Sequence, residues 1–157
     1  MEDLSSILWH ERDMLDLLLF KLEVEQLVLT SGRTHWLARA AREIETALEE
    51  IRQVELLRAV AADSLAAELG LEPNPSLQTI AETSGEPWRG IWLDHREAFI
   101  GVSTRISEMS QSNRVLLTAG YQAAQATLLS MTERSATYGA DGSVSSDRRV
   151  SLIDRAL

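Results

Sequence analysis

Between residues 88 and 135, mostly apolar side chains recur along one stripe at alternating spacings of four and three residues. This is the heptad pattern of a helix that lies along other helices. The stripe consists of Trp88, Trp92, His95, Phe99, Val102, Ile106, Met109, Asn113, Leu116, Gly120, Ala123 and Thr127. No proline interrupts it, so the pattern predicts one continuous helix, about 70 Å long at 1.5 Å per residue. A helix of this length cannot bury its stripe on itself and needs partner helices.

Two earlier segments supply candidate partners. Residues 4–30 carry leucines at heptad spacing, with Glu11 and Glu25 on the same seam. Because charged groups are rarely buried without a partner, we expect both carboxylates to reach water. Thr34 is predicted to cap a second long helix over residues 35–69. The short link between the two helices predicts that they lie antiparallel.

A connector joins the second and third long helices. Gly70 is expected to end the second helix, and Pro73 and Pro75 cannot continue it. Ser76 is a credible N-cap for a short helix over residues 77–83, and Pro87 is well placed to open the long helix. We expect this connector to lie across one end of the bundle.

The predicted fold class is therefore all-α: an elongated antiparallel helical bundle or coiled coil of three long helices with a short connector helix. We assign residues 1–135 to the bundle domain. Residues 136–157 begin with a glycine-containing turn and end in a short amphipathic segment. Ten residues are too few to hold a helix alone, so we expect a flexible tail.

Composition limits the possible partners. The chain has 157 residues and a net charge of −9, with 15 basic against 24 acidic side chains. This balance argues against a general binder of nucleic acid or anionic membranes, which needs a basic face. There is no cysteine, and no apolar run is long enough for membrane insertion. The opening residues are acidic, unlike a secretory signal, so we expect a cytoplasmic protein.

Catalytic and metal-binding patterns are missing from the sequence. A carboxylate-bridged metal centre in a helical bundle needs glutamate three residues before histidine, and none of the three histidines has one. No nucleophile elbow or glycine-rich phosphate loop is present. We therefore predict no enzyme activity, no cofactor and no metal site, and we interpret His95 as a structural residue.

Asn113 is a polar residue on an apolar seam, and we assign it a structural role together with Trp88 and Trp92. A buried asparagine usually fixes register at a cost in stability. On this reading, leucine at position 113 should leave the melting temperature equal or higher. A position tilted toward the surface is the alternative.

Taken together, the sequence resembles the flagellar export chaperones of the FlgN family over nearly its whole length. The resemblance rests on the leucine-rich first helix with embedded glutamates, the end of the second helix and the connector. Two motifs are more specific: Asn113 followed by paired leucines, and Tyr138-Gly139 followed by Gly142. Family members often have a second asparagine three residues before the first motif, where this sequence has Ser110.

The resemblance implies a chaperone that binds the terminal helical segments of hook-associated proteins, the hook–filament junction proteins. It would prevent their premature assembly and aid delivery to the export apparatus. The resemblance also implies that the C-terminal region takes part in client binding. The residues expected to do so are Tyr138, Gly139, Val150, Leu152, Ile153 and Leu157.

Other readings stay open at this level. The tail residues could instead pack back onto the bundle as a C-terminal cap. The chain could be an acidic helical adaptor or a structural coiled-coil protein without an export role. Contact with export apparatus components and formation of a homo-oligomer are also left open.

Overall fold

The computed structural model describes residues 1–137, with side chains described as far as residue 132. Its elements are α1 (Glu2–Thr30), the 3₁₀ turn η1 (Thr34–Trp36), α2 (Leu37–Leu69), α3 (Leu77–Thr83) and α4 (Trp88–Thr137). No strand occurs in this part of the chain, which confirms the predicted all-α class. The prediction that Thr34 caps the second long helix was wrong: Thr34 begins the 3₁₀ turn, α2 begins at Leu37, and its N-cap Trp36 makes no side-chain cap hydrogen bond.

The chain divides into two units, Met1–Leu116 and Leu117–Leu157. We call the first unit the bundle. The predicted domain boundary at residue 135 stays a prediction.

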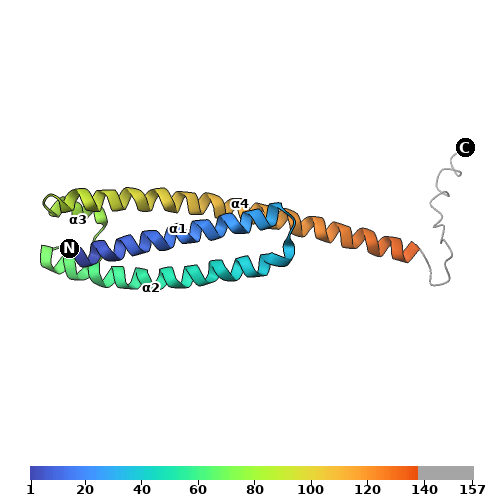
Figure 1. Cartoon of the computed structure of the whole chain (residues 1–157), viewed down its shortest axis with the longest axis horizontal. Coiled ribbons are helices and arrows are strands. Elements are labelled where there is room, and N and C mark those ends of the chain that lie inside the picture. The colour runs from blue at the N-terminus through green and yellow to red at the C-terminus, as the bar shows by residue number, and fades with distance from the viewer. Residues whose placement is uncertain (138–157) are drawn as a thin grey trace, which may run out of the picture. The chain divides into compact units, whose positions relative to one another are not determined.

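Within the bundle, α1, α2 and α4 lie side by side, and α1 is seen between the other two in the view of Figure 1. Helix α2 runs antiparallel to α1, as the ion pair from Lys21 to Glu43 at 2.7 Å and that from Glu11 to Arg58 at 2.8 Å show. Helix α4 runs parallel to α1. The polar contacts that join these two helices, such as Gln26 to Ser112 at 2.9 Å, advance along both in the same direction. The path is therefore up, down and up, with antiparallel neighbours in sequence, as predicted.

The connector closes one end of the bundle, as expected. Gly70 adopts a left-handed conformation (φ 69°) that terminates α2. The Ser76 hydroxyl accepts a hydrogen bond from the Thr79 amide at 3.1 Å, and this caps α3. Ile80 and Ala81 of α3 are buried in the cluster that also contains the first turns of α1.

Trp92 is the centre of this end cluster. Its side chain is fully buried among Leu4, Leu8 and Ile80. The indole Nε1 donates a hydrogen bond to Ser84 Oγ at 3.2 Å, and the Ser84 hydroxyl donates to the Ile80 carbonyl. Trp88 stacks on Trp92 with 5.3 Å between ring centroids. The two tryptophans thus tie the start of α4 to α3 and α1.

A second cluster fills the bundle farther along α1. It contains Leu18, Leu22, Ala47 and Ile51, with Ile106 and Met109 packed against it. Leu18 and Leu22 belong to the leucine seam predicted for α1, and Ile106 and Met109 belong to the stripe predicted for α4, so the heptad spacing identified these core positions.

The prediction that Glu11 and Glu25 reach water was wrong. Their exposed fractions are 5% and 8%. Glu11 pairs with Arg58 of α2, and Glu25 accepts a hydrogen bond from Asn113 of α4 at 2.9 Å. Each seam glutamate is buried because a distant segment supplies its partner.

Candidate docking face on α4

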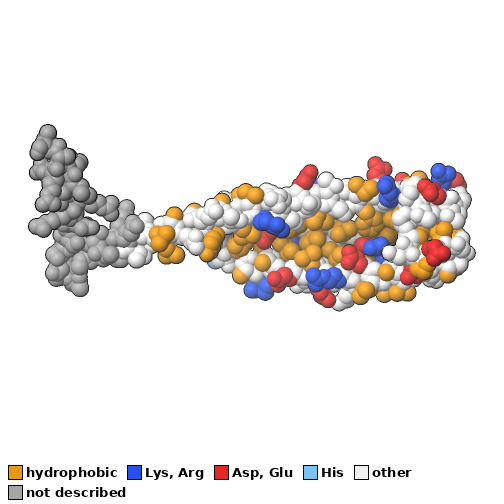
Figure 2. All heavy atoms as spheres, turned by 180° about the vertical axis from the view of Figure 1, so that it is seen from behind, with side chains coloured by type: hydrophobic (Ala, Val, Ile, Leu, Met, Phe, Trp, Pro, Cys, Tyr) orange, Lys and Arg blue, Asp and Glu red, His pale blue; other side chains and the backbone are white. Residues whose placement is uncertain are grey.

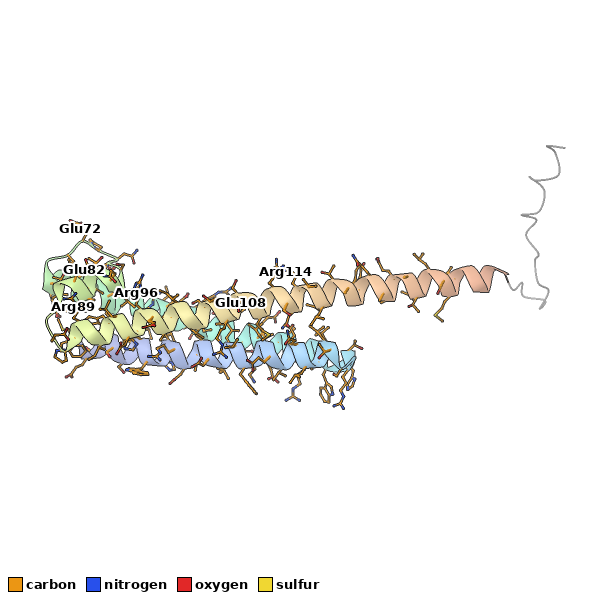
Figure 3. All side chains as sticks on the ribbon, turned by 90° about the horizontal axis from the view of Figure 1, so that it is seen from above. Glu72, Glu82, Arg89, Arg96, Glu108 and Arg114 are labelled. Atoms are coloured by element: carbon orange, nitrogen blue, oxygen red, sulfur yellow. The ribbon has the colours of Figure 1, made fainter. Side chains whose placement is uncertain are left out.

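Helix α4 changes character after Arg114, labelled in Figure 3, because the next charged residue along the chain is Glu133. Residues 115–132 contain no charged side chain. Every residue from 117 to 132 is nevertheless exposed. An exposed helix usually carries charges on its solvent side, so a long charge-free stretch indicates a surface that meets a partner.

Several apolar residues of this stretch share one face, while Leu129, 67% exposed, lies beside it. Steps of four and three place them in line, in the same pattern that buries α4 within the bundle. We call this set the docking face: Leu117, Tyr121, Ala124, Leu128 and Met131. Tyr121, Leu128 and Met131 are 65%, 65% and 62% exposed. The face therefore keeps the coiled-coil spacing of α4, and its residues are exposed.

Polar side chains in the same stretch bond within their own helix. Thr127 donates to the Ala123 carbonyl at 2.9 Å and Ser130 to the Thr127 carbonyl at 2.8 Å. Gln125 donates to the Tyr121 hydroxyl at 2.7 Å. Because these groups already have partners, burying the segment against another helix would leave few of them unsatisfied.

Sequence reasoning missed this face. It extended the strict heptad stripe from Asn113 through Gly120, Ala123 and Thr127, all of which are exposed. The larger side chains lie one position later, after a step of four from Asn113 to Leu117. The charge-free run between Arg114 and Glu133 was the signal that could have found the face.

Asn113 lies at the end of the buried stripe and is 2% exposed. Its Nδ2 donates to the Leu22 carbonyl at 2.8 Å and to Glu25 Oε2 at 2.9 Å. The surface-tilted alternative is thereby excluded. The contacts are those that aligning α4 on α1 would require, and this alignment role stays a prediction. Because Asn113 also donates to the buried Glu25 side chain, replacing Asn113 with leucine would remove a hydrogen-bond donor. The prediction that this change leaves the melting temperature equal or higher did not include this loss.

His95 is also buried, with 1% of its surface exposed. Its ring lies edge-on to Trp9, with centroids 5.1 Å apart, and Nε2 is 3.5 Å from Ser5 Oγ. Burial lowers the pKa of His95, Arg12 lowers it further, and Asp94 opposes the shift. Among the described residues, no group of three or more His, Asp or Glu side chains is placed to hold a metal ion.

The predicted client-binding residues of the tail, Tyr138, Gly139, Val150, Leu152, Ile153 and Leu157, lie outside the described residues. Trp92 lies in the end cluster and Trp88 packs against it, and the structural role assigned to them stays a prediction.

No helix in the described part of the chain combines the length and the apolar character needed to cross a membrane. The model of the FlgN protein family matches residues 1–146. The chain belongs to the FlgN family. Neither a curated protein nor a solved structure matches it.

Family membership makes this chain a flagellar export chaperone. The FlgN family is a family of chaperones and not of enzymes, in agreement with the missing catalytic patterns. Chaperones of this family bind flagellar export substrates.

Proposed function

We propose that this FlgN-family chaperone binds the terminal helical segments of hook-associated proteins in the cytoplasm. Binding keeps these segments from assembling prematurely and aids their delivery to the export apparatus. The observation that carries the proposal is the docking face, a coiled-coil seam exposed over residues 117–132. A helical client segment with its own apolar stripe would complete that seam by helix-to-helix packing.

We further propose that the tail extends the client site. Tyr138 and Gly139 follow α4 directly, and the terminal segment adds Val150, Leu152, Ile153 and Leu157. A segment that folds on binding can wrap a client while losing part of the interaction energy to ordering. The docking face and the tail would then form one continuous site.

The docking face offers a closely matched test. Ala124 lies on the face, and Ala126 lies two residues later, about 200° around the helix. Both are exposed, so Ala124→Asp and Ala126→Asp make the same chemical change on opposite sides. Calorimetry with a purified hook-associated protein should show about tenfold or greater loss of affinity for Ala124→Asp, because the new charge would be buried unpaired. Ala126→Asp should bind like the wild type.

Circular dichroism of both variants controls for helix content, which should be equal. Equal loss of binding in the two variants would show that added negative charge matters and the face does not. Undiminished client binding in both variants would show that the docking face is not the client site.

Truncation after Ser135 tests the tail separately. If the tail contributes to the client site, the truncated chaperone should keep its melting temperature and lose affinity. A clear drop in melting temperature with unchanged client binding would instead support the C-terminal cap.

A further inference from the structure

A second apolar surface lies in the bundle, apart from the docking face. Helices α1, α2 and α4 and the start of α3 enclose an open groove of about 520 Å³. We call it the bundle groove. Its apolar lining includes Leu15, Leu77, Phe99 and Ile100, over the fully buried Leu8. Seen from behind the view of Figure 1, hydrophobic side chains gather in a band along the bundle between charged side chains (Figure 2).

The groove has the dimensions of a short helical segment. It extends from Leu8 to Leu15 along α1 and from Arg96 to Ser103 along α4. Seven residues of helix correspond to about 10 Å, or two turns. Two turns present three apolar anchors at i, i+3 or i+4, and i+7, the spacing by which helices bind in grooves.

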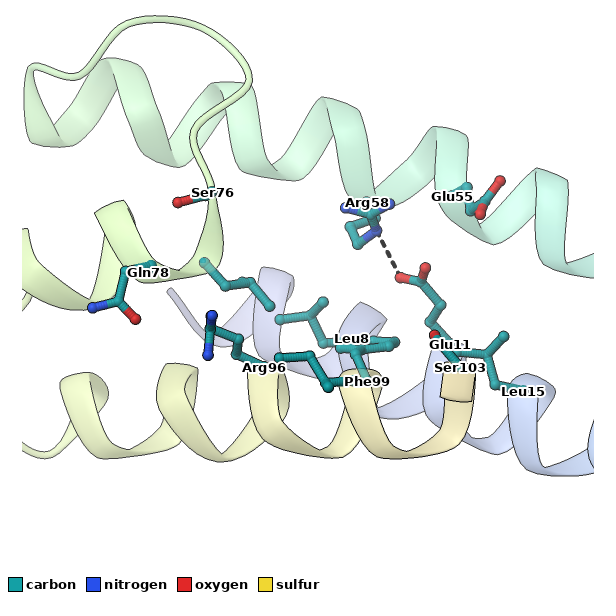
Figure 4. A pocket seen from close by; sticks show the side chains of 12 residues that line it. Leu8, Glu11, Leu15, Glu55, Arg58, Ser76, Gln78, Arg96, Phe99 and Ser103 are labelled. Carbon is teal, nitrogen blue, oxygen red and sulfur yellow. Dashed lines mark ion pairs between the residues drawn. The ribbon is translucent and has the colours of Figure 1, made fainter. Parts of the chain in front are cut away.

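Charges of opposite sign stand on the two walls. Arg96 projects from α4 near Gln78, and Glu55 stands on α2 near the other end (Figure 4). Both side chains are exposed. The other two charged residues of the lining, Glu11 and Arg58, pair with each other at 2.8 Å. Among the described residues that line the groove, the charged side chains without an ion-pair partner are thus Arg96, at the α3 end, and Glu55, farther along.

We propose that the bundle groove binds two turns of an amphipathic helix from a partner protein. The partner helix carries an acidic residue that meets Arg96 and, about two turns later, a basic residue that meets Glu55. Acidic residues favour helix N-termini and basic residues C-termini, so the partner helix runs parallel to α1 and α4. All lining residues belong to the bundle, so this site does not depend on the proposed client site.

The probe is a stapled peptide of about 14 residues, held helical because short helices are marginal in water. It has leucine anchors at i, i+3 and i+7, a glutamate near its N-terminus and an arginine two turns later. A control peptide has the same composition with glutamate and arginine exchanged. Fluorescence anisotropy with the full-length chaperone should show saturable binding, about fivefold tighter for the first peptide.

The double variant Arg96→Glu with Glu55→Arg should reverse this preference, while Ile100→Asp should abolish binding of both peptides. Ala124→Asp, on the docking face, should leave peptide binding unchanged. Melting temperatures of the variants identify any that fail to fold, and Arg96→Glu alone, at an exposed position, should then still remove the preference for the first peptide.

Equal binding of both peptides to wild type and double variant would overturn the proposed charge recognition. Absence of saturable binding would overturn the groove as a helix site. Self-association that is lost in Ile100→Asp would also overturn the proposal, because a second copy would then occupy the groove.

Discussion

Asn113 of α4 donates a hydrogen bond to the buried carboxylate of Glu25 of α1, across 2.9 Å. The two residues are 88 positions apart in sequence, and each is polar within an apolar seam. Glu25 would be costly there without a donor, since a buried polar group costs free energy unless it is hydrogen-bonded, and Asn113 also donates to the Leu22 carbonyl at 2.8 Å. Together they form a polar lock between parallel helices.

Asn113→Leu should lower the free energy of unfolding by about 1–3 kcal/mol, because Glu25 would lose its donor inside the bundle. The double variant Asn113→Leu with Glu25→Leu should recover much of this loss, since two apolar groups replace both partners. Urea unfolding of the wild type, both single variants and the double variant gives the coupling energy. Additive effects would show that the two side chains do not stabilise each other.

Glu11 should make stability depend on pH in mildly acidic solution. Burial raises the pKa of Glu11 above its usual 4.5, Arg58 opposes this rise, and Glu55 adds to it. A raised folded-state pKa means that the folded chain holds the proton more tightly than the unfolded chain. The contribution of Glu11 to the stability of the folded chain is therefore fully present below pH 4.5 and is lost as pH rises through the folded-state pKa of Glu11.

The measurement compares wild type with Glu11→Gln by urea unfolding between pH 4 and pH 7. The stability of the wild type relative to Glu11→Gln should fall as pH rises across this window. A constant difference would mean that Glu11 has the same pKa folded and unfolded.

His95 should have the opposite pH dependence. Its pKa is lowered from 6.5, chiefly by burial, so the folded chain favours the neutral ring. The stabilising contribution is present above pH 6.5 and is lost as pH falls through the folded-state pKa. Relative to His95→Gln, the wild type should lose stability on acidification. The proton resonances of the His95 ring, followed by NMR, would report its pKa directly.

Two glycine-to-alanine changes should shift the free energy of unfolding in opposite directions. Gly70 has φ 69° in the turn after α2, whereas Gly101 lies within α4, and an added Cβ would meet open space at both. Gly70→Ala should destabilise by about 1 kcal/mol because alanine disfavours positive φ. Gly101→Ala should stabilise by about 0.5–1 kcal/mol through its helix propensity. Thermal melts of the two variants provide the comparison, and a shift of the same sign in both would contradict this account.

The sequence predicted the helices well because heptad spacing and turn residues are local signals. Ser76, Gly70 and the stripe around Trp92 placed α3, the end of α2 and the core of α4 without knowledge of the tertiary structure. Burial of Glu11 and Glu25 could not be predicted in the same way. Their partners, Arg58 and Asn113, come from other helices, and only the assembled bundle brings them together.

The docking face was missed for a different reason. A heptad stripe does not reveal where its partner helices end, and the stripe of α4 is buried at Asn113 but exposed at Gly120. The bundle groove was equally hidden, because its walls are contributed by segments as distant as Leu8 and Phe99. The predicted tail residues beyond Thr137 stay predictions.

The parallel pairing of α1 with α4 has a consequence for the order of folding. Lys21 and Glu43 join α1 to α2 across 22 residues, whereas Leu22 and Asn113 join α1 to α4 across 91. Closing the longer loop costs about 1 kcal/mol more in chain entropy, and α4 is also synthesised last. The α1–α2 hairpin should therefore form first, with one side of α1 uncovered until α4 docks. Loss of the Asn113 contact should then accelerate unfolding far more than it slows folding. The polar lock between Asn113 and Glu25 should therefore act mainly on the unfolding rate of the bundle.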